Sequence, residues 1–486
     1  MVWWYPVFPA WAWNRWIRHG PWWPWFPLLT FRLLNSWLIR TSFNPDEYWQ
    51  GPEVAHAWYY GYGGDGARDH GGQLTWEWEK CIALRGVLHP GLFLLLLAAL
   101  PFESPLLVAY APRLLQGTLA SLADLAVYRS AHRLGGNPLV FWTMLVQLIG
   151  WFQLYALPRT FSSSLEAILG AWILERSIAS SGVTRSISVL VLGSLQVAIR
   201  PTASGFWFTW AAYKMCGLLQ RGDLHSLFVD LLAPGLMISG GILAFSTLLD
   251  SLYYGQLTLV PLNFLRFNLL SDGSALYGSH PWYWYFTEGM AVTLGTFLPF
   301  CCFGVRVGWD ALQPLRPLIV SAVVSILLLS LASHKEYRFL LPFFPLFSLL
   351  TGLGLQRTNS WLQASNAARP KGSFLVAVFL PQVFAGIFFC NVHQRGAEGV
   401  MAHLRTHPAG DDGVFFLTAC HATPFHSFVH GQQELGYLDC SPGRNSPQKR
   451  FFERPLPVLR ELFPEAQHNG TEAAPPKGAA LKPCLD

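Results

Sequence analysis

Residues 339–355 read FLLPFFPLFSLLTGLGL and carry no charged side chain. A helix that crosses a bilayer core about 30 Å thick needs about 20 mostly apolar residues, within a range of about 17–25. This stretch therefore has the length and composition of a membrane-spanning helix. Four other stretches fit the same description clearly, and they cover residues 138–157, 231–249, 289–305 and 373–391.

Weaker apolar stretches add to this set. One of them, at 22–39, is interrupted by Arg32 and Asn35. The others are shorter or contain Pro and Gly, and they lie at 90–110, 165–179, 187–199, 202–219 and 318–332. Each span must satisfy its own backbone hydrogen bonds, and the alternating pattern of a membrane β-barrel is absent. The sequence predicts an all-α polytopic membrane protein with about ten to twelve transmembrane helices.

Charged side chains are scarce throughout the chain. Lys, Arg, Asp and Glu make up 13% of its 486 residues, against roughly 25% in soluble domains. Hydrophobic residues make up 52%, and many of the 22 tryptophans stand at the ends of the apolar stretches, as in interfacial belts. These figures argue against a soluble enzyme and a disordered protein. No basic segment interleaved with aromatics is present, so we expect no nucleic-acid partner.

The charges that remain predict the orientation and the domain division. Residues 1–40 carry four arginines and no acid, whereas residues 41–87 carry seven acids and three bases. The positive-inside rule places the N-terminus in the cytoplasm and loop 41–87 on the luminal side. We therefore expect a transmembrane domain at 1–392, followed by a polar and luminal region at 393–486. The end of that region, at 473–482, has the composition of a disordered segment.

The first candidate for chemistry is the stretch NPDEYWQ at residues 44–50. Asp46 and Glu47 are adjacent carboxylates beside aromatic residues at a membrane surface, where one could deprotonate a sugar hydroxyl. The same residues are also typical of a helix N-terminus. Asn44 would cap it, Pro45 would occupy its first position, and the two acids would meet the positive end of its dipole. The two interpretations are compatible, because a capped helix holds a carboxylate in place.

Other residues of the same loop suit a carbohydrate. If the helix continues, Trp49, Glu53 and His56 share one face, although a lone histidine is more often a hydrogen-bonded structural residue. Further along, Trp76 and Glu77 offer a flat apolar surface and a carboxylate acceptor. Interfacial anchoring explains the tryptophan equally well.

A short link between two apolar spans holds three groups that can be cationic, His334, Lys335 and Arg338. Such groups hold a phosphate by charge-assisted hydrogen bonds, although cationic flanks that snorkel to the membrane surface are as common. The aromatic stretch YGSHPWYWY at 277–285 adds His280 as a possible polar contact. By itself this stretch is more typical of a membrane-surface belt.

The C-terminal region offers little support for a metal. It contains His421, His426 and His430, but no Cys or carboxylate pattern completes a recognisable site. Cys420 and Cys440 could instead form a disulfide in an oxidising lumen. The chain also has no Asp-x-Asp sequence, which counts against the metal-nucleotide site of many sugar transferases. We therefore predict no metal and no cofactor.

Ionisable residues largely avoid the middles of the apolar stretches, with Arg32 and Arg200 as exceptions. A charge at the bilayer centre costs about 2.5–3.5 kcal/mol on insertion scales, and proton-coupled transporters usually carry several. The distribution therefore favours an enzyme that works at one membrane face. A lipid or solute transporter and a non-catalytic assembly subunit are the alternatives from other classes.

Taken together, these motifs resemble the dolichyl-phosphate-mannose-dependent α-mannosyltransferases. The residues similar to their first luminal loop are 44–50, 53–56 and 74–78. HKEYRF at 334–339 is similar to their His-Lys-Glu-Phe/Tyr-Arg-Phe motif. Three further stretches resemble the branch of the family that builds the GPI anchor, and these are 277–282, 392–396 and 420–424. The likeness covers roughly residues 28–440. An apparent insertion at 63–73 interrupts the likeness. After about residue 440 the likeness is lost, and the chain ends early.

The resemblance implies a GT-C glycosyltransferase fold in the endoplasmic reticulum membrane, with a luminal active site. It implies transfer of the third mannose, through an α1,2 linkage, from dolichyl-phosphate-mannose to the GPI precursor. A β-linked donor and an α-linked product mean inversion, which fits direct attack by the acceptor hydroxyl with one carboxylate base. Sister activities, on a lipid-linked N-glycan or on the fourth GPI mannose, remain open because chemistry alone does not identify the acceptor.

The same resemblance assigns roles to the candidate residues. Asp46 would be the base, with Glu47 as second choice. The groups holding the dolichyl phosphate would be His334, Lys335 and Arg338. The groups orienting the glycan acceptor would be His56, Trp76, Glu77 and His280. No metal is needed in this scheme, because a phosphate leaving group requires cations more than it requires protonation.

Overall fold

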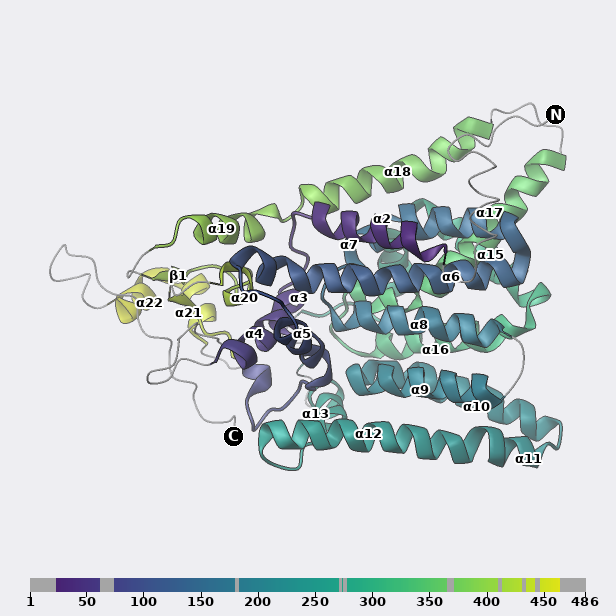
Figure 1. Cartoon of the computed structure of the whole chain (residues 1–486), viewed down its shortest axis with the longest axis horizontal. Coiled ribbons are helices and arrows are strands. Elements are labelled where there is room, and N and C mark those ends of the chain that lie inside the picture. Colours follow the sequence, from purple (N-terminus) through teal and green to yellow (C-terminus); the bar gives the residue numbers. More distant parts are fainter. Residues whose placement is uncertain are drawn as a thin grey trace.

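The structure is a computed structural model of the chain. It describes residues 23–61, 74–179, 183–270, 273, 278–364, 371–409, 413–430, 434–441 and 446–463. The insertion expected at 63–73 and the terminal segment 473–482 lie outside these residues. Figure 1 shows a bundle of long helices with a smaller helical and stranded region at one end. We call that smaller part, made by residues 41–61, 74–87 and 395–463, the cap.

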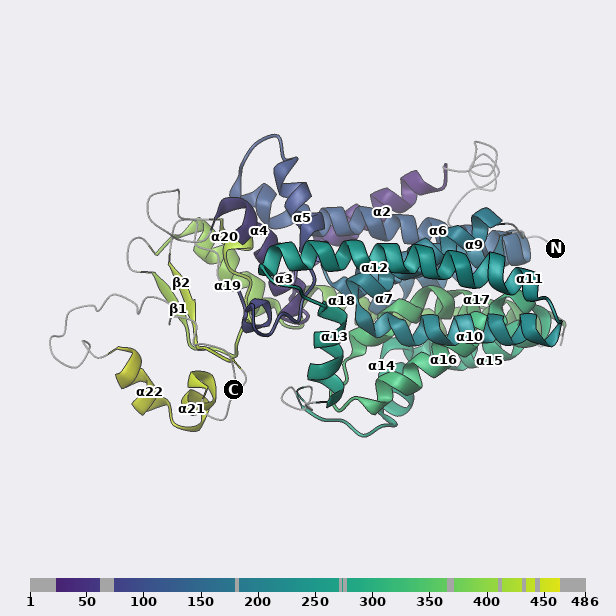
Figure 2. The ribbon, with the colours of Figure 1, turned by 90° about the horizontal axis from the view of Figure 1, so that it is seen from below.

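Long helices run side by side through the bundle in both views (Figures 1 and 2). In chain order they are α2 (Trp25–Leu38), α6 (Pro105–Ile149), α8 (Ser162–Ile178), α9 (Val183–Ile199), α10 (Ser204–Gln220), α12 (Ala233–Tyr254), α15 (Leu298–Ala311), α16 (Arg316–Leu331), α17 (Phe344–Ala364) and α18 (Lys371–Asn391). Shorter helices connect them, namely α5 (Leu88–Ala98), α7 (Trp151–Ala156), η2 (Pro201–Ala203), α11 (Leu224–Ser226), η3 (Leu227–Leu232), α13 (Val260–Leu265), η4 (Arg266–Leu270), η6 (Tyr285–Gly289), α14 (Met290–Leu294), η7 (Gly295–Phe297), η8 (Gln313–Leu315) and η9 (Tyr337–Phe343).

The helical membrane architecture expected from the sequence is confirmed. Within the described residues, five helical segments are long and apolar enough to cross a membrane. They are Leu224–Tyr254, Tyr285–Asp310, Gln313–Leu331, Tyr337–Ala364 and Gly372–Thr406. Each contains one of the predicted spans or most of it. The chain is therefore a multi-pass membrane protein.

The predicted span at 90–110 is wrong, because the structure divides it. Helix α5 ends at Ala98, and α6 starts only at Pro105. The side chain of Ser104 caps the new helix by accepting a hydrogen bond from the backbone N–H of Leu107 at 3.3 Å. Hydropathy registers apolar side chains, whereas serine and proline at this point set a helix start.

The predicted span at 138–157 is also interrupted. Helix α6 ends before Gly150, which takes a ψ of 118° and separates it from α7. Within α6, Gly136 has φ 61° and ψ −158°, so the helix turns just ahead of Pro138. A proline inside a helix removes one backbone hydrogen bond and crowds the preceding turn, and a glycine with positive φ relieves that conflict.

The first part of α6 was missed by the sequence reasoning because it carries charges. One of them, Asp124, forms a buried ion pair with Arg32 of α2, with N–O distances of 2.6 and 2.9 Å. Gln147 also donates to the Asp124 carboxylate at 2.8 Å. Charged residues that neutralise each other inside a bundle lower the hydropathy of a helix without exposing it to lipid.

The cap brings together segments from both ends of the sequence. Its helices and strands are α3 (Asp46–Trp49), α4 (Pro52–Tyr60), η1 (Trp76–Trp78), α19 (Arg395–Thr406), β1 (Val414–Phe416), α20 (His426–Val429), β2 (Leu435–Tyr437), α21 (Pro447–Glu453) and α22 (Pro455–Leu462). Strands β1 and β2 pair in parallel. Tyr48 and Trp49 share a buried apolar cluster with Met401, Phe425 and Phe428. The division of the chain at residue 393 stays a prediction, and this shared core ties the later region to the early loop.

Candidate active site

The local sequence holds Asp46 at the start of α3. The side-chain oxygen of Asn44 accepts a hydrogen bond from the Asp46 backbone N–H at 3.0 Å, and Pro45 precedes the helix. The predicted helix is therefore present, but it begins one residue later than predicted, with Pro45 at the cap position and Asp46 at the first helical position. The predicted continuation toward His56 is wrong, because α3 stops at Trp49 and α4 begins at Pro52. Proline cannot donate the backbone hydrogen bond that a continuous helix would need there.

The structure places Asp46 in a network with the second candidate motif. Arg338 Nη2 lies 2.5 Å from Asp46 Oδ2, and Arg338 Nε lies 2.6 Å from Glu336 Oε2. His334 Nε2 lies 2.9 Å from the other Glu336 oxygen, and Asn44 donates to Glu336 at 3.0 Å. Two motifs almost 300 residues apart thus form one cluster of charges at the junction of bundle and cap.

Asp46 and Glu47 occupy opposite environments. The Glu47 carboxylate is fully buried and pairs with Arg113 at 2.9 Å and with Arg159 at 2.6 Å, one arginine to each oxygen. The Asp46 side chain is 26% exposed. In the described part of the chain it is bonded only through Oδ2, to Arg338. A carboxylate with an accessible oxygen can approach a hydroxyl, so the geometry favours Asp46 over Glu47 as base.

Glu336 and Lys335 are adjacent in the chain, but only Glu336 has oppositely charged partners in the network. Burial by itself raises the pKa of Glu336, but Arg338 and His334 outweigh it and hold that pKa below its usual range. Glu336 is therefore an anchor that stays ionised at neutral pH. Lys335 is buried, donates to the carbonyls of His280 at 3.0 Å and Ala332 at 2.5 Å, and has no carboxylate at ion-pair distance among the described residues. Burial lowers its pKa.

Two of the residues predicted to orient an acceptor lie on the early loop. Glu77 Oε1 accepts from Arg85 Nη2 at 2.5 Å, and Trp76 is buried against the ring of Phe267. Burial lowers the pKa of Arg85, but Glu77 and Asp46 together outweigh it and raise that pKa. Loop 74–87 therefore contributes to the same electrostatic environment as Asp46.

The other two predicted acceptor residues are placed less directly. His280 has an exposed side chain, and its ring centroid lies 4.9 Å from that of Trp284. His56 is buried in the cap with Trp49 and Glu53, and all three contact residues 423–430 despite the break in the helix. Their partners are the Thr423 carbonyl at 2.9 Å from Trp49, the Phe425 N–H at 2.6 Å from Glu53 and the His430 ring at 3.0 Å from His56.

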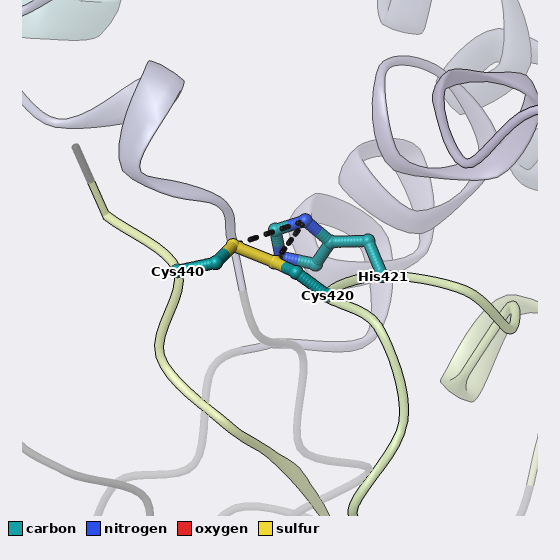
Figure 3. A group of neighbouring side chains, drawn as sticks. All are labelled: Cys420, His421 and Cys440. Carbon is teal, nitrogen blue, oxygen red and sulfur yellow. Dashed lines mark hydrogen bonds between the residues drawn. A yellow bond between two sulfur atoms is a disulfide. The ribbon is translucent and has the colours of Figure 1, made fainter. Parts of the chain in front are cut away.

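A disulfide lies close to this junction. Cys420 and Cys440 are joined, with their Cα atoms 5.9 Å apart, so the predicted pairing is confirmed. Figure 3 shows the His421 ring against the two sulfur atoms. Although the three potential ligand atoms lie within 4.8 Å of one another, sulfur atoms joined in a disulfide are not the thiolates that zinc binds. His421 also packs on Trp49, with ring centroids 4.6 Å apart, and burial lowers its pKa to about 4.

Two cavities in the bundle lie next to the charged network. The larger, of about 690 Å³, is lined mainly by apolar side chains from α8, α10, α16, η9 and α17. The smaller, of about 510 Å³, is more polar and includes Gln50, Arg85 and His89. Arg200 and Thr202 line both. The apolar cavity thus extends from the bundle to Arg200 and Phe339, and Phe339 is the residue next to Arg338.

Sequence reasoning missed the arginines that organise this region. Arg113 and Arg159 hold Glu47, Arg85 holds Glu77, and Arg200 stands between the cavities. A signal was available for Arg200, which interrupts an apolar stretch, because an ionisable residue within a membrane segment indicates a functional or paired site. Its partners could not be read from the sequence.

Comparison with known proteins adds the family. The profile of the Alg9-like mannosyltransferase family matches residues 23–430. The chain belongs to this family. The match includes both Asp46 and Arg338 as well as the disulfide-bonded Cys420. Membership and fold together make this Alg9-like chain a glycosyltransferase, as expected from the sequence.

Relatives support the same assignment at the level of whole chains. The chain is 33% identical to the mannosyltransferase APTG1 of Arabidopsis thaliana, over 89% of this chain and 81% of that protein. It is 34% identical to the GPI alpha-1,2-mannosyltransferase 3 of Homo sapiens, over 85% of this chain and 71% of that protein.

Solved structures show the fold. ArnT from Cupriavidus metallidurans bound to undecaprenyl phosphate superposes with a TM-score of 0.57 at 12% identity, covering 88% of this chain and 87% of that one. The Archaeoglobus fulgidus oligosaccharyltransferase superposes with a TM-score of 0.52 at 13% identity, covering 87% and 64%. The Alg9-like chain therefore has the GT-C fold that its motifs predict.

Proposed function

We propose that the chain is an inverting α1,2-mannosyltransferase that adds the third mannose to the GPI precursor from dolichyl-phosphate-mannose. One observation carries this proposal. A partly exposed Asp46 carboxylate is held through one oxygen by Arg338. The Arg338 guanidinium lies over the ring of Phe339, which lines an apolar cavity of about 690 Å³. The relatives named GPI alpha-1,2-mannosyltransferase 3 supply the acceptor and the linkage.

The reaction we propose uses Asp46 as general base. Its free oxygen, Oδ1, takes the proton of the acceptor hydroxyl while that hydroxyl oxygen attacks the anomeric carbon of the donor. The bond from the anomeric carbon to phosphate breaks on the opposite face, and dolichyl phosphate leaves with the electron pair. Arg338 keeps Oδ2 fixed, so that Oδ1 is the oxygen presented to the acceptor.

The donor side of the proposal rests on shape and charge. An isoprenoid chain is apolar and would occupy the larger cavity, whose lining includes Ile173, Leu174 and Phe343. The donor-phosphate role of His334, Lys335 and Arg338 remains part of the proposal. Lys335 supports it best, because no carboxylate neutralises its ammonium group in the described residues. Side-chain cations stabilise a phosphate leaving group, so we propose a metal-independent reaction.

The acceptor side and the location are proposed together. Glu77 and Trp76 lie in the environment of Asp46 and would orient the glycan, with His280 at the rim. His56 would act indirectly, by holding the segment around His430 against α4. We place the cap in the lumen of the endoplasmic reticulum, and its disulfide supports an oxidising compartment.

The decisive experiment is mannosyl transfer in vitro, with dolichyl-phosphate-mannose as donor and a GPI precursor with two mannoses as acceptor. The wild-type chain should add one α1,2-linked mannose, and a chelator should leave the rate unchanged. Asp46→Asn should abolish transfer. Asp310→Asn, a change at a side chain that is 66% exposed, is the matched control and should retain full activity.

The same assay separates the alternatives. Near-normal transfer by Asp46→Asn would remove Asp46 from the catalytic role. Transfer to a lipid-linked N-glycan or to a three-mannose GPI acceptor, with none to the two-mannose acceptor, would assign a sister activity. Rescue of cells that lack the third GPI mannosyltransferase provides an independent measurement in vivo.

A further inference from the structure

Arg200 occupies a site that the local backbone creates for it. Helix α9 ends at Ile199, and Pro201 opens the short helix η2. Arg200 itself is extended, with φ −140° and ψ 107°, and its side chain is only 12% exposed. A guanidinium at this break lies at the cap end of the bundle and is largely shielded from water.

The charge of Arg200 is weakly compensated compared with that of its neighbour. In the described part of the chain, its ion pair is a single contact of 3.4 Å between Nε and Glu166 Oε2. Arg338 instead binds carboxylates at 2.5 and 2.6 Å on two sides. Both guanidinium groups lie over the Phe339 ring, at 5.3 Å for Arg200 and 5.5 Å for Arg338. Arg200 therefore brings a mostly available fork of N–H donors to the edge of the charged network.

The cavities on either side of Arg200 differ in chemistry. The apolar cavity extends from it between α8, α10 and α16, and the polar cavity extends toward Gln50 and Arg85. Few molecules match that order of an apolar compartment, a cation and a polar compartment. A lipid-linked sugar does, because its isoprenoid, phosphate and sugar follow one another in the same order.

We propose that Arg200 is the anchor for the donor phosphate, with the isoprenoid in the apolar cavity and the sugar in the polar cavity beside Arg85. This inference rests on the proposed function and deepens it. Arginine suits the task because its planar fork can bind two phosphate oxygens at once. In this arrangement Arg200 joins the cations proposed for the donor phosphate, and Arg338 also positions the base.

The test measures binding of dolichyl phosphate, the reaction product, to the purified full chain without any acceptor. Arg200→Gln should weaken that binding at least tenfold and raise the KM for dolichyl-phosphate-mannose by a similar factor. Arg200→Lys keeps the charge but loses the planar fork of donors. Its affinity for dolichyl phosphate should therefore lie between those of the wild type and Arg200→Gln. Arg306→Gln is the control, because that side chain is 81% exposed on α15.

A second variant guards against misfolding. Arg200→Gln leaves the Glu166 carboxylate without its cation, so the double variant Arg200→Gln/Glu166→Gln removes both charges. Binding should remain weak in the double variant while its unfolding temperature stays close to that of the wild type. Dolichyl phosphate binding at wild-type affinity in both variants would overturn the assignment of Arg200.

Failure of this inference can be told apart from failure of the proposed function. Asp46→Asn should lose transfer but bind dolichyl phosphate as the wild type does. If the wild-type chain transfers mannose and Arg200→Gln leaves the donor KM unchanged, only the anchor is wrong. If the wild-type chain uses no dolichyl-phosphate-mannose with any acceptor, the proposed function is wrong as well.

Discussion

Asp46 and Glu47 are chemically almost identical and adjacent in the chain, yet the fold gives them different roles. Successive residues in the short helix α3 point in different directions, so Glu47 enters the interior and Asp46 stays at the surface. Arg113 of helix α6 and Arg159 of the turn between α7 and α8 neutralise the buried carboxylate. A charge without these partners would be too costly to bury.

A first prediction follows from that burial. Glu47→Gln should lower the free energy of unfolding by about 3–5 kcal/mol, because it leaves the buried Arg159 without its carboxylate partner, while Arg113 keeps Glu398. Thermal unfolding in detergent measures the effect, with Asp310→Asn as the exposed control. A variant that unfolds like the wild type but has lost transfer would show that Glu47 is catalytic after all.

A second prediction concerns acid and His421. Burial lowers the pKa of His421 from its ordinary 6.5 to about 4, so between these values the unfolded chain binds the proton more readily. Stability from the neutral ring is therefore complete above pH 6.5 and is lost as the pH falls toward 4. The drop in unfolding temperature between pH 7 and pH 5 should be smaller in His421→Gln than in the wild type. His407→Gln, at an exposed side chain, should keep the wild-type drop, and an equal drop in all three proteins would contradict the prediction.

At the scale of elements, the residues around the disulfide form a clamp on α3 and α4. Trp49 and Glu53 both bond the segment that follows Cys420, and the disulfide closes that segment over a sequence separation of 20 residues. The clamp therefore connects the stability of the C-terminal region to the position of the helix that starts at Asp46.

A third prediction tests this clamp. Cys420→Ser should destabilise the cap by about 3 kcal/mol on the chain-entropy account of a loop of this length, and should speed proteolysis between β1 and β2. Reducing agent should lower the unfolding temperature of the wild type and have no further effect on the variant. Cys216→Ser, at an exposed free cysteine, is the control. Unchanged stability of the wild type under reduction would argue against the clamp.

Much of the helical architecture was predictable because apolar length alone identifies a membrane helix. The breaks at Gly150 and Ser104 were less visible, since backbone geometry and not hydropathy sets them. The charged part of α6 was hidden because Asp124 is neutralised by a residue 92 positions away. The same limit applies to the site. Both motifs were visible in the sequence, but the contact between Asp46 and Arg338 depends on tertiary structure.

At the scale of the whole molecule, one fold serves different acceptors. The chain shares its architecture with ArnT and with an oligosaccharyltransferase at only 12% and 13% identity. A fold shared at such low identity does not fix the chemistry, which must therefore reside in local residues. The residues around Asp46 are our candidates for that role.

A fourth prediction concerns orientation in the membrane. The turn at Gly222, next to α11, lies at the end of the bundle far from α20 (Figures 1 and 2). In sealed endoplasmic reticulum vesicles, a protease-sensitive tag at Gly222 should be cut from outside, and one between β2 and α21 should be protected until detergent is added. The reverse pattern would place the cap in the cytoplasm.

The contact between Glu53 and residues 425–427 has a consequence for biosynthesis. The carboxylate of Glu53 leaves the ribosome long before Ser427 exists, since 374 positions separate the two. Every long bundle helix after α2 is synthesised in between. The nascent chain therefore carries Glu53 without its hydrogen-bond donors while those helices insert, and the cap closes around α4 only after residue 427 has been made. A chain stalled before residue 427 lacks this contact and leaves Tyr48 and Trp49 without the later members of their apolar cluster, which exposes it to quality control.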